Sequence, residues 1–310
     1  MSMYIFIVNP VSGNGKAKRA WKKVKQELDK QGVHYRSFYT NYPGHAQEIA
    51  RQVAELYHDK LAAIVSVGGD GTFHEMINGL TAYPQLPVGC IPAGSGNDVI
   101  RGFRLPRTPV KAVKHLLQAS MQKARQYDLG EYELYQKRKG KGRFINGVGI
   151  GFDGEAAKLT NGSAYKHWLN KFKCGGLAYV ISALRLIFNY ETRSLKITID
   201  GVQHVYSDVW LVAISNIPYY AGGMKIAPKA NPADGTFNLC IVHGLKPLKL
   251  LFIFGTVYFG WHSRLKEVTL LEGKNIRVES DQPMTIHADG EIIGQTPLKV
   301  SVLNKEIRIW

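Results

Sequence analysis

A strand-like run that ends in a glycine-rich turn constrains the fold of this chain more than any other segment. Leu61–Val67 is mainly apolar, as expected for a strand of a parallel sheet that is covered on both faces. It continues directly into Gly68-Gly69-Asp70-Gly71-Thr72, and a helix is predicted over Phe73–Leu80. A strand that passes through a glycine turn into a helix indicates an α/β fold.

The first third of the chain repeats this alternation. Short β-rich runs at Tyr4–Val8, Tyr35–Tyr39 and Val88–Ile91 alternate with amphipathic helical patterns at Lys16–Gln31 and His45–Tyr57. We therefore predict an N-terminal α/β domain with a mainly parallel sheet over residues 1–127.

The pattern changes near Tyr127, where many short strands separated by polar turns begin. Helical segments are predicted near Leu177–Phe188 and Leu248–Trp261. We expect a β-rich second domain over residues 128–310, with the extreme C-terminus available to pack back on the first domain. Its predicted strands are Arg125–Leu134, Arg143–Ile150, Ser194–Ile199, Val205–Ile214, Phe237–Val242, Asn275–Glu279, Met284–His287 and Leu298–Val302.

The composition indicates which kinds of binding partner and which cell compartment to expect for this protein. A formal net charge of +16 over 310 residues favours a polyanion: nucleic acid, an anionic membrane surface or a phosphorylated substrate. Cys90, Cys174 and Cys240 are far apart, which indicates neither a zinc site nor a disulfide framework and fits a reducing cytoplasm. The apolar stretch Leu250–Trp261 is shorter than the roughly 20 residues that span a bilayer, so no crossing of a membrane is expected.

Three loops at the ends of predicted parallel strands carry the strongest chemical signal. Amide groups in the Gly68–Thr72 turn, at the start of a helix, are suited to bind phosphate. Asp70 adds an oxygen ligand of the kind that Mg²⁺ uses beside nucleotide phosphates. The loops Asn9–Lys16 and Gly94–Asp98 are expected at the same sheet edge, where open α/β sheets bind ligands. We predict one composite phosphate site, although each loop alone is also explained as an ordinary turn.

With these motifs in order, the chain resembles the bacterial diacylglycerol kinase family, whose catalytic domain is shared with eukaryotic diacylglycerol, sphingosine and ceramide kinases. The resemblance covers nearly the whole chain, and the family usually has Thr where Ser95 stands. The motifs that carry it are Asn9-Pro10-x-Ser12-Gly13, Gly68-Gly69-Asp70-Gly71-Thr72 with Glu75 and Asn78-Gly79, Gly94-Ser95-x-Asn97-Asp98, Asn146–Asp153, Gly222-Gly223-Met224, Pro228–Gly235 and Asp289-Gly290-Glu291.

This resemblance implies a nucleotide-binding α/β domain followed by a β-sandwich, with the active site in the cleft between them. It implies ATP and Mg²⁺ as cofactors, Asp70 in an aspartate–water–Mg²⁺ network, and Asp234 as a ligand of a second, structural Mg²⁺. It also implies Asp289 as the catalytic base, with Glu291 beside it. The implied nucleotide-binding residues are Asn9, Gly13, Lys16, Thr40, Gly68, Gly69, Asp70, Gly71, Thr72, Glu75, Gly94, Ser95, Gly96 and Asn97.

The local sequence around two of these aspartates has a simpler explanation. Asp289 and Asp234 each precede a glycine, and Asp-Gly is a common turn pair. The residues themselves leave open whether Asp70 or Asp289 takes the proton from an alcohol.

The implied function is ATP-dependent phosphorylation of a lipid hydroxyl, most simply that of diacylglycerol, by a cytoplasmic enzyme at an anionic membrane surface. Candidate membrane-facing segments are the basic runs Lys137–Arg143 and Lys158–Lys173, and ordinary solvated loops are the alternative. Leu248–Trp261 is predicted as a helix buried against the sandwich, in preference to an interfacial helix. A homodimer is compatible with the sequence.

Two other classes of function remain open. NAD kinases share the Gly-Gly-Asp-Gly turn, but Asn97-Asp98-Val99-Ile100 lacks the Glu of their Asn-Asp-Ala-Glu segment. A non-catalytic nucleic-acid binder would fit the basic charge, but no helix-turn-helix or aromatic RNA-binding signature is present, so nucleic acid is not the expected partner.

Overall fold

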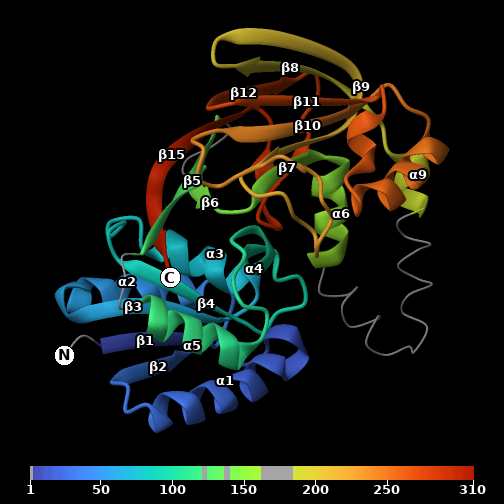
Figure 1. Ribbon diagram of the computed structural model, residues 1–310. Coiled ribbons are helices and arrows are strands. Elements are labelled where there is room, and N and C mark those ends of the chain that lie inside the picture. Colours follow the sequence, from blue (N-terminus) through green and yellow to red (C-terminus); the bar gives the residue numbers. More distant parts are fainter. Residues whose placement is uncertain (1–2, 121–123, 136–139, 162–183) are drawn as a thin grey trace.

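A computed structural model describes residues 3–120, 124–135, 140–161 and 184–310. Figure 1 shows an α/β part below and a β-rich part above, and both termini lie at the lower part. The strands of the two parts form one continuous hydrogen-bonded sheet, in the order β14-β13-β7-β9-β8-β12-β15-β4-β3-β1-β2. This arrangement places the predicted N-terminal α/β fold and a C-terminal sandwich-like fold next to each other.

The lower part is a parallel sheet with helices on both faces. Its strands are β1 (Met3–Val8), β2 (Tyr35–Tyr39), β3 (Leu61–Gly68) and β4 (Pro87–Pro92), which all pair in parallel. Ile64 and Val65 of β3 pack into different hydrophobic clusters, one on each face of the sheet. This two-sided burial is the reason that the strand reads as an apolar run in the sequence.

The helices of this part divide between the two faces. α1 (Ser12–Lys30) and α5 (Pro109–Ala119) pack with Val65, whereas α2 (His45–Tyr57) and α3 (Asp70–Gly79) pack with Ile64. The short α4 (Asp98–Gly102) follows the loop after β4, and η1 (His58–Lys60) follows α2. β1 is followed by α1, β3 by α3, and β4 by the loop before α4, so the carboxyl ends of these three strands carry the segments that start the helices.

The upper part is built from antiparallel strands around a second core that includes Phe144, Ile214 and Leu239. α6 (Phe152–Asn161), α9 (Pro247–Val257) and η2 (Trp261–Arg264) lie beside it. Its strands are β5 (Arg125–Leu134), β6 (Lys141–Phe144), β7 (Gly147–Gly151), β8 (Arg193–Ile199), β9 (Val202–Ser215), β10 (Phe237–His243), β11 (Val268–Gly273), β12 (Asn275–Ser280), β13 (Thr285–Ala288), β14 (Glu291–Gln295) and β15 (Leu298–Ile309).

The last strand joins the two parts. β15 pairs antiparallel with β12 and β5 in the upper part, and its final residues Arg308 and Ile309 pair in parallel with Pro87 and Val88 of β4. The predicted boundary after residue 127 falls within β5. The C-terminal strand therefore holds the parallel sheet of the lower part against the upper part through main-chain hydrogen bonds.

Several sequence expectations need correction at the level of elements. Arg143–Ile150 is two strands, β6 and β7, because the chain leaves the ladder at Ile145 and Asn146, whose amides bind a carboxylate. β11 and β14 were not predicted, and β15 runs to Ile309 rather than ending at Val302. Most of the predicted helix Leu177–Phe188 lies outside the described residues, as do parts of the basic runs Lys137–Arg143 and Lys158–Lys173.

Candidate active site

Three glycine-bearing loops meet at the carboxyl ends of β1, β3 and β4. A Cβ atom added to Gly94 would overlap Gly69 Cα, and one added to Gly13 would overlap the carbonyl oxygen of Ala93. Loops from neighbouring parallel strands reach the same sheet edge, and only glycine allows backbones to approach this closely. The structure thus brings together the three loops that the sequence predicted as one phosphate site.

Asn9 holds two of these loops together. Its backbone N–H donates to Val67 O at 3.0 Å, and its Nδ2 donates to Thr72 Oγ1 at 3.1 Å. Asn9 Oδ1 is buried without a hydrogen-bond partner among the described residues. Because a buried polar atom without a partner is costly, this oxygen is a candidate acceptor for a bound ligand. Thr40 is buried beside the same strand, and its N–H donates to Val8 O at 2.9 Å.

The amide groups at the start of α3 are the other candidate phosphate ligands. Gly69 is the residue before the helix, and the first amides of a helix have no partner within it. Gly71 is only partly buried at this end, and Ser95 and Lys16 are exposed on the two neighbouring loops. The helix terminus and a lysine therefore present positive charge on the side where a phosphate chain would lie.

Two predicted nucleotide-binding side chains have other partners. Asn97 closes its own loop, because Oδ1 accepts from Gly94 N at 3.2 Å and Nδ2 donates to Gly94 O at 3.0 Å. Glu75 accepts hydrogen bonds from Gly44 N at 2.8 Å and Ala46 N at 3.1 Å, at the start of α2. These side chains shape the loops around the site, and direct contact of either with a nucleotide stays a prediction.

Asp70 lies at the start of α3, between the second and third glycine loops. Its Oδ1 accepts from Val99 N at 2.9 Å, and its Oδ2 lies beside Gly96. Burial raises the pKa of Asp70 above its ordinary value, and the nearby charges of Asp98 and Asp289 raise it further. A bound cation would relieve this crowding of like charges, so the residues fit the predicted Mg²⁺ role of Asp70.

Sequence reasoning missed the link from the third loop to the second domain. Asp98 accepts from Gly222 N at 2.7 Å and from an Arg101 guanidinium nitrogen at 2.8 Å. The same nitrogen of Arg101 also donates to Gly96 O. The Asn-Asp of the loop motif and the Gly222-Gly223 turn were both noted in the sequence, but nothing in their spacing indicated that they pair between the two domains.

Asp289, the predicted catalytic base, is buried and accepts four hydrogen bonds from the protein itself. Its side chain is 0% exposed. Oδ2 accepts from His74 Nδ1 at 2.8 Å and Ile145 N at 2.9 Å, while Oδ1 accepts from Asn146 N at 2.8 Å and Gly147 N at 3.1 Å. The pKa of His74 is raised, because the charge and hydrogen bond of Asp289 outweigh desolvation. Asp289 thus joins α3 of the first domain to the β6–β7 corner of the second.

Glu291 lies on the same turn but has access to solvent. It is exposed, and its Oε1 lies 3.8 Å from the position that a Cβ of Gly71 would take, at the start of α3. A buried pair supports this turn from behind: His287 Nε2 lies 2.8 Å from Asp153 Oδ2, and Gly290 N donates to His287 Nδ1 at 3.2 Å. The geometry thus directs Glu291 toward the loops of the first domain.

Known proteins match the chain over its whole length. Residues 3–131 match the family described as "Diacylglycerol kinase catalytic domain", and residues 146–310 match the "YegS C-terminal NAD kinase beta sandwich-like domain". The Bacillus subtilis (strain 168) protein named "Putative lipid kinase YtlR" is 33% identical over 309 residues, covering 100% of this chain and 99% of that protein. The chain belongs to the bacterial diacylglycerol kinase family.

A further relative is similar in sequence, and two solved structures are similar in fold. A Mycobacterium tuberculosis (strain CDC 1551 / Oshkosh) protein named "Diacylglycerol kinase" is 27% identical over 98% of this chain and 93% of that protein. The crystal structure titled as a "putative diacylglycerol kinase" from Bacillus anthracis str. Sterne shares the fold, with a TM-score of 0.77 at 23% identity over 99% of this chain and 96% of that one. Yeast NADH kinase shares it more distantly, with a TM-score of 0.54 at 12% identity over 99% and 82% of the two chains.

Membership of this diacylglycerol kinase family supports a kinase activity and use of ATP, whereas the likenesses do not identify the acceptor. Within the described residues, no group of three or more His, Cys, Asp or Glu side chains is arranged to hold a metal ion. Asp234, the predicted ligand of a second Mg²⁺, is exposed and accepts from Thr236 N and Thr236 Oγ1, both at 3.0 Å, as in an ordinary Asp turn. Its metal role stays a prediction.

Asp128, which the sequence did not single out, anchors the loop that carries Asp234. Its side chain accepts from Gly235 N at 2.7 Å and from Lys305 N at 2.8 Å, and the residue is 0% exposed.

No helix in the described part of the chain is both long and apolar enough to cross a bilayer.

Proposed function

We propose that this kinase transfers the γ-phosphate of ATP, with Mg²⁺, to a lipid hydroxyl at an anionic membrane surface, and that diacylglycerol is the acceptor to test first. One observation carries the proposal. The three glycine loops of the α/β domain meet at one edge, and the Asp289–Glu291 turn of the other domain faces the start of α3. Phosphoryl transfer needs such positioning of phosphates on one side and an alcohol on the other.

The carboxylates around this edge support different roles. Asp289 already accepts four hydrogen bonds and is fully buried, so it is suited to position His74 and the β6–β7 corner. Glu291 is exposed beside Gly71 and is free of that constraint, so we assign it as the acceptor of the alcohol proton. The earlier assignment of Asp289 as the base stays a prediction that the variants below test.

Asp70 is the carboxylate that would hold Mg²⁺ together with the nucleotide phosphates. The cation would neutralise charge on the transferring phosphoryl group, and the like charges of Asp98 and Asp289 near Asp70 make the site favourable for it. Within the chain itself, Asn9 Oδ1 and the first amides of α3 would orient the nucleotide, and Lys16 would add positive charge.

The acceptor is identified by supplying radiolabelled ATP with either a mixed bacterial lipid extract or NAD. We expect the label to enter the organic phase, and diacylglycerol added to the extract to increase it. Label that enters only a dinucleotide would replace the lipid proposal with a NAD kinase activity. DNA binding at physiological salt without any ATP turnover would instead favour a non-catalytic binder.

The roles of the carboxylates are separated by comparing Glu291→Gln with Asp289→Asn. Glu291→Gln should lower kcat by at least about a hundredfold, a typical size for general-base catalysis, with unchanged ATP affinity and thermal stability. Asp289→Asn should lower both kcat and thermal stability, because an amide nitrogen would face the donors of His74 and Ile145. A catalytically normal Glu291→Gln, or a fully stable but inactive Asp289→Asn, would return the base role to Asp289.

A further inference from the structure

Helix α9 and the segment after it expose large apolar side chains on the upper domain. Leu250, Ile253 and Val257 are buried against the sandwich, as the sequence predicted for this helix. The opposite face of α9 and the segment that follows the helix expose further apolar side chains. We call these residues the α9 patch: Leu248, Leu251, Phe252, Tyr258, Phe259 and Trp261. A helix that is apolar on both faces requires a second partner besides its own core.

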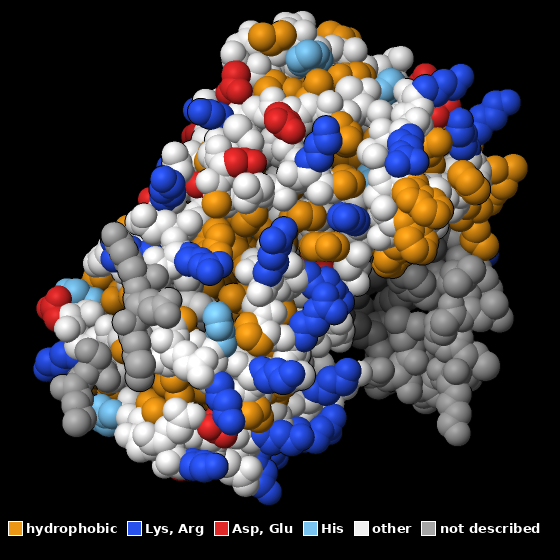
Figure 2. All heavy atoms as spheres, in the orientation of Figure 1, with side chains coloured by type: hydrophobic (Ala, Val, Ile, Leu, Met, Phe, Trp, Pro, Cys, Tyr) orange, Lys and Arg blue, Asp and Glu red, His pale blue; other side chains and the backbone are white. Residues whose placement is uncertain are grey.

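The exposure of the α9 patch is large for side chains of this kind. Phe252 is 68% exposed, Phe259 66% and Trp261 58%, and the rings of Phe259 and Trp261 stack with centroids 5.0 Å apart. Figure 2 shows hydrophobic side chains gathered on one flank of the upper part, and Figure 1 places α9 on that flank. Contiguous apolar surface of this type marks an interaction site with a protein or a membrane.

The charges around the α9 patch favour a membrane over a protein as its partner. Residues 244–266 contain four Lys or Arg and no Asp or Glu. Lys246, Arg264 and Lys266 are exposed. Lys249 pairs with Glu267, the first acidic residue after the segment, at 2.6 Å. Aromatic side chains with a basic border suit the interface of an anionic bilayer, where rings insert among head groups and cations attract them.

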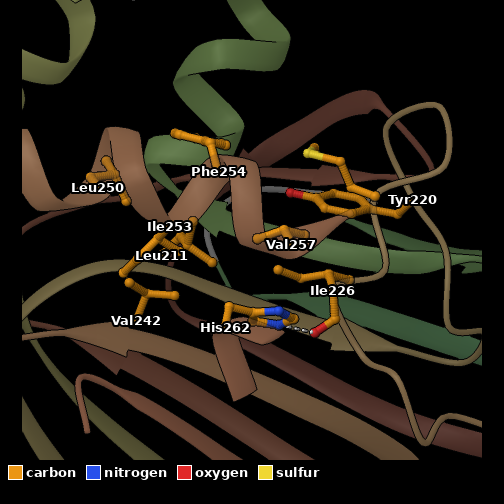
Figure 3. Close-up of a pocket in the computed structure, with 10 residues that line it drawn as sticks. Leu211, Tyr220, Ile226, Val242, Leu250, Ile253, Phe254, Val257 and His262 are labelled. Atoms are coloured by element: carbon orange, nitrogen blue, oxygen red, sulfur yellow. Dashed lines mark hydrogen bonds between the residues drawn. The ribbon is translucent and has the colours of Figure 1, made fainter. Parts of the chain in front are cut away.

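The buried face of α9 is connected to the candidate active site by packed side chains. Under α9 is a pocket lined mainly by apolar side chains, among them Leu250, Ile253 and Val257 (Figure 3). Tyr220 forms part of its wall, and the ring of Tyr220 stacks on His287 with centroids 6.0 Å apart and planes at 7°. Since His287 supports the Asp289–Glu291 turn, packed side chains connect the buried face of α9 to that turn.

We propose that the α9 patch inserts into the surface of an anionic phospholipid bilayer and docks the kinase there. The inference rests on the proposed function, because a lipid acceptor is the reason for such docking. Binding to vesicles without nucleotide tests it separately from catalysis. The full chain is mixed with vesicles of phosphatidylcholine alone or with phosphatidylglycerol added, and the bound fraction is measured by flotation.

The variant that tests the α9 patch carries Phe252→Gln and Trp261→Gln, and its matched control carries Val202→Gln and Val205→Gln, which are 61% and 70% exposed on β9. Loss of two inserted rings should weaken partitioning into phosphatidylglycerol vesicles by at least about tenfold, and the control should stay within about twofold. Lys246→Gln with Arg264→Gln should weaken binding to anionic vesicles and leave the weak binding to phosphatidylcholine unchanged.

Each outcome has a clear meaning. A patch variant that loses vesicle binding but still phosphorylates a short-chain diacylglycerol in solution supports docking. Docking is overturned if the patch variant and the parent bind vesicles equally. It is also overturned if the substitutions only convert a dimer to a monomer in light scattering, because the α9 patch would then be a contact between two copies of the chain. If the parent chain binds vesicles through the α9 patch but phosphorylates no lipid, the docking proposal stands and the proposed function is wrong.

Discussion

At the scale of single residues, the same dipeptide has three different fates in this protein. Asp-Gly occurs five times in the chain, and at three of these places, Asp70, Asp234 and Asp289, the sequence offers the same turn explanation. Asp70 is partly buried near like charges at a helix start, Asp234 is exposed and bonds to its own turn, and Asp289 accepts four hydrogen bonds with its side chain fully buried. Burial and donors, which come from distant segments, decide the chemistry.

Because Asp70 is desolvated and lies near Asp98 and Asp289, removing its negative charge should stabilise the folded protein. Because folding raises the pKa of Asp70 above 3.8, its stabilising contribution is present below that pH and is lost as pH rises through the raised pKa. Asp70→Asn should therefore raise the melting temperature at neutral pH, with the difference shrinking toward pH 4, while turnover falls. A melting temperature below that of the parent at neutral pH would contradict this account of the site.

At the scale of elements, side chains of one helix hold the start of another. Glu75 of α3 accepts from Gly44 N and Ala46 N, and α2 has no capping side chain of its own at Gly44. The loop with Thr40 is thereby tied to the helix that begins in the glycine turn. The sequence showed Glu75 only as a member of a motif, because a cap between two helices depends on their packing.

Glu75→Ala should cost about 0.5–2 kcal/mol of unfolding free energy, the range measured for lost helix caps. Urea denaturation followed by circular dichroism measures the change. Glu55→Ala, on the exposed face of α2, is the matched control and should change stability by less than about 0.5 kcal/mol. Equal effects of the two substitutions would mean that the cap contributes nothing.

The contact between glycine loops gives a second prediction at this scale. Gly94→Ala should weaken ATP binding by about tenfold or more, because overlap with Gly69 separates the loops and such overpacking costs about 1–3 kcal/mol. Isothermal titration calorimetry measures the affinity. In Gly255→Ala the new Cβ meets nothing within 4 Å, so this control should bind ATP as the parent does. Unchanged affinity in Gly94→Ala would show that the loop contact is not needed for binding.

At the scale of the whole molecule, two of the links between the domains are β15 and the His74–Asp289 pair. β15 carries the sheet from the sandwich to β4, and the pair joins α3 to the turn after β13. Both links join segments that are far apart in the chain, so relative placement of the domains depends on interactions that no local pattern encodes.

The His74–Asp289 link predicts a pH-dependent stability. The pKa of His74 is raised above 6.5 by Asp289, with Glu291 and Glu75 also facing it, so its contribution is complete below pH 6.5 and is lost as pH rises through the raised pKa. His74→Gln should cost about 1.5–3 kcal/mol near pH 6 and less near pH 9, measured by urea denaturation. The exposed His34→Gln should show no such trend. A constant cost across this pH range would mean that the charge of His74 adds nothing to the link.

The sequence by itself determined the α/β class and the β-rich second part, because hydrophobic periodicity and turn residues act over a few neighbouring residues. It also predicted that the glycine loops share one sheet edge, since the carboxyl ends of parallel strands lie together, but the close contacts between the loops come from the packing. The break at Ile145 and Asn146 and the long β15 were decided only by tertiary structure, since each is fixed by partners such as Asp289 and β4. The same holds for the exposed face of α9: its composition reads as core, and only packing decides which of its two apolar faces is covered.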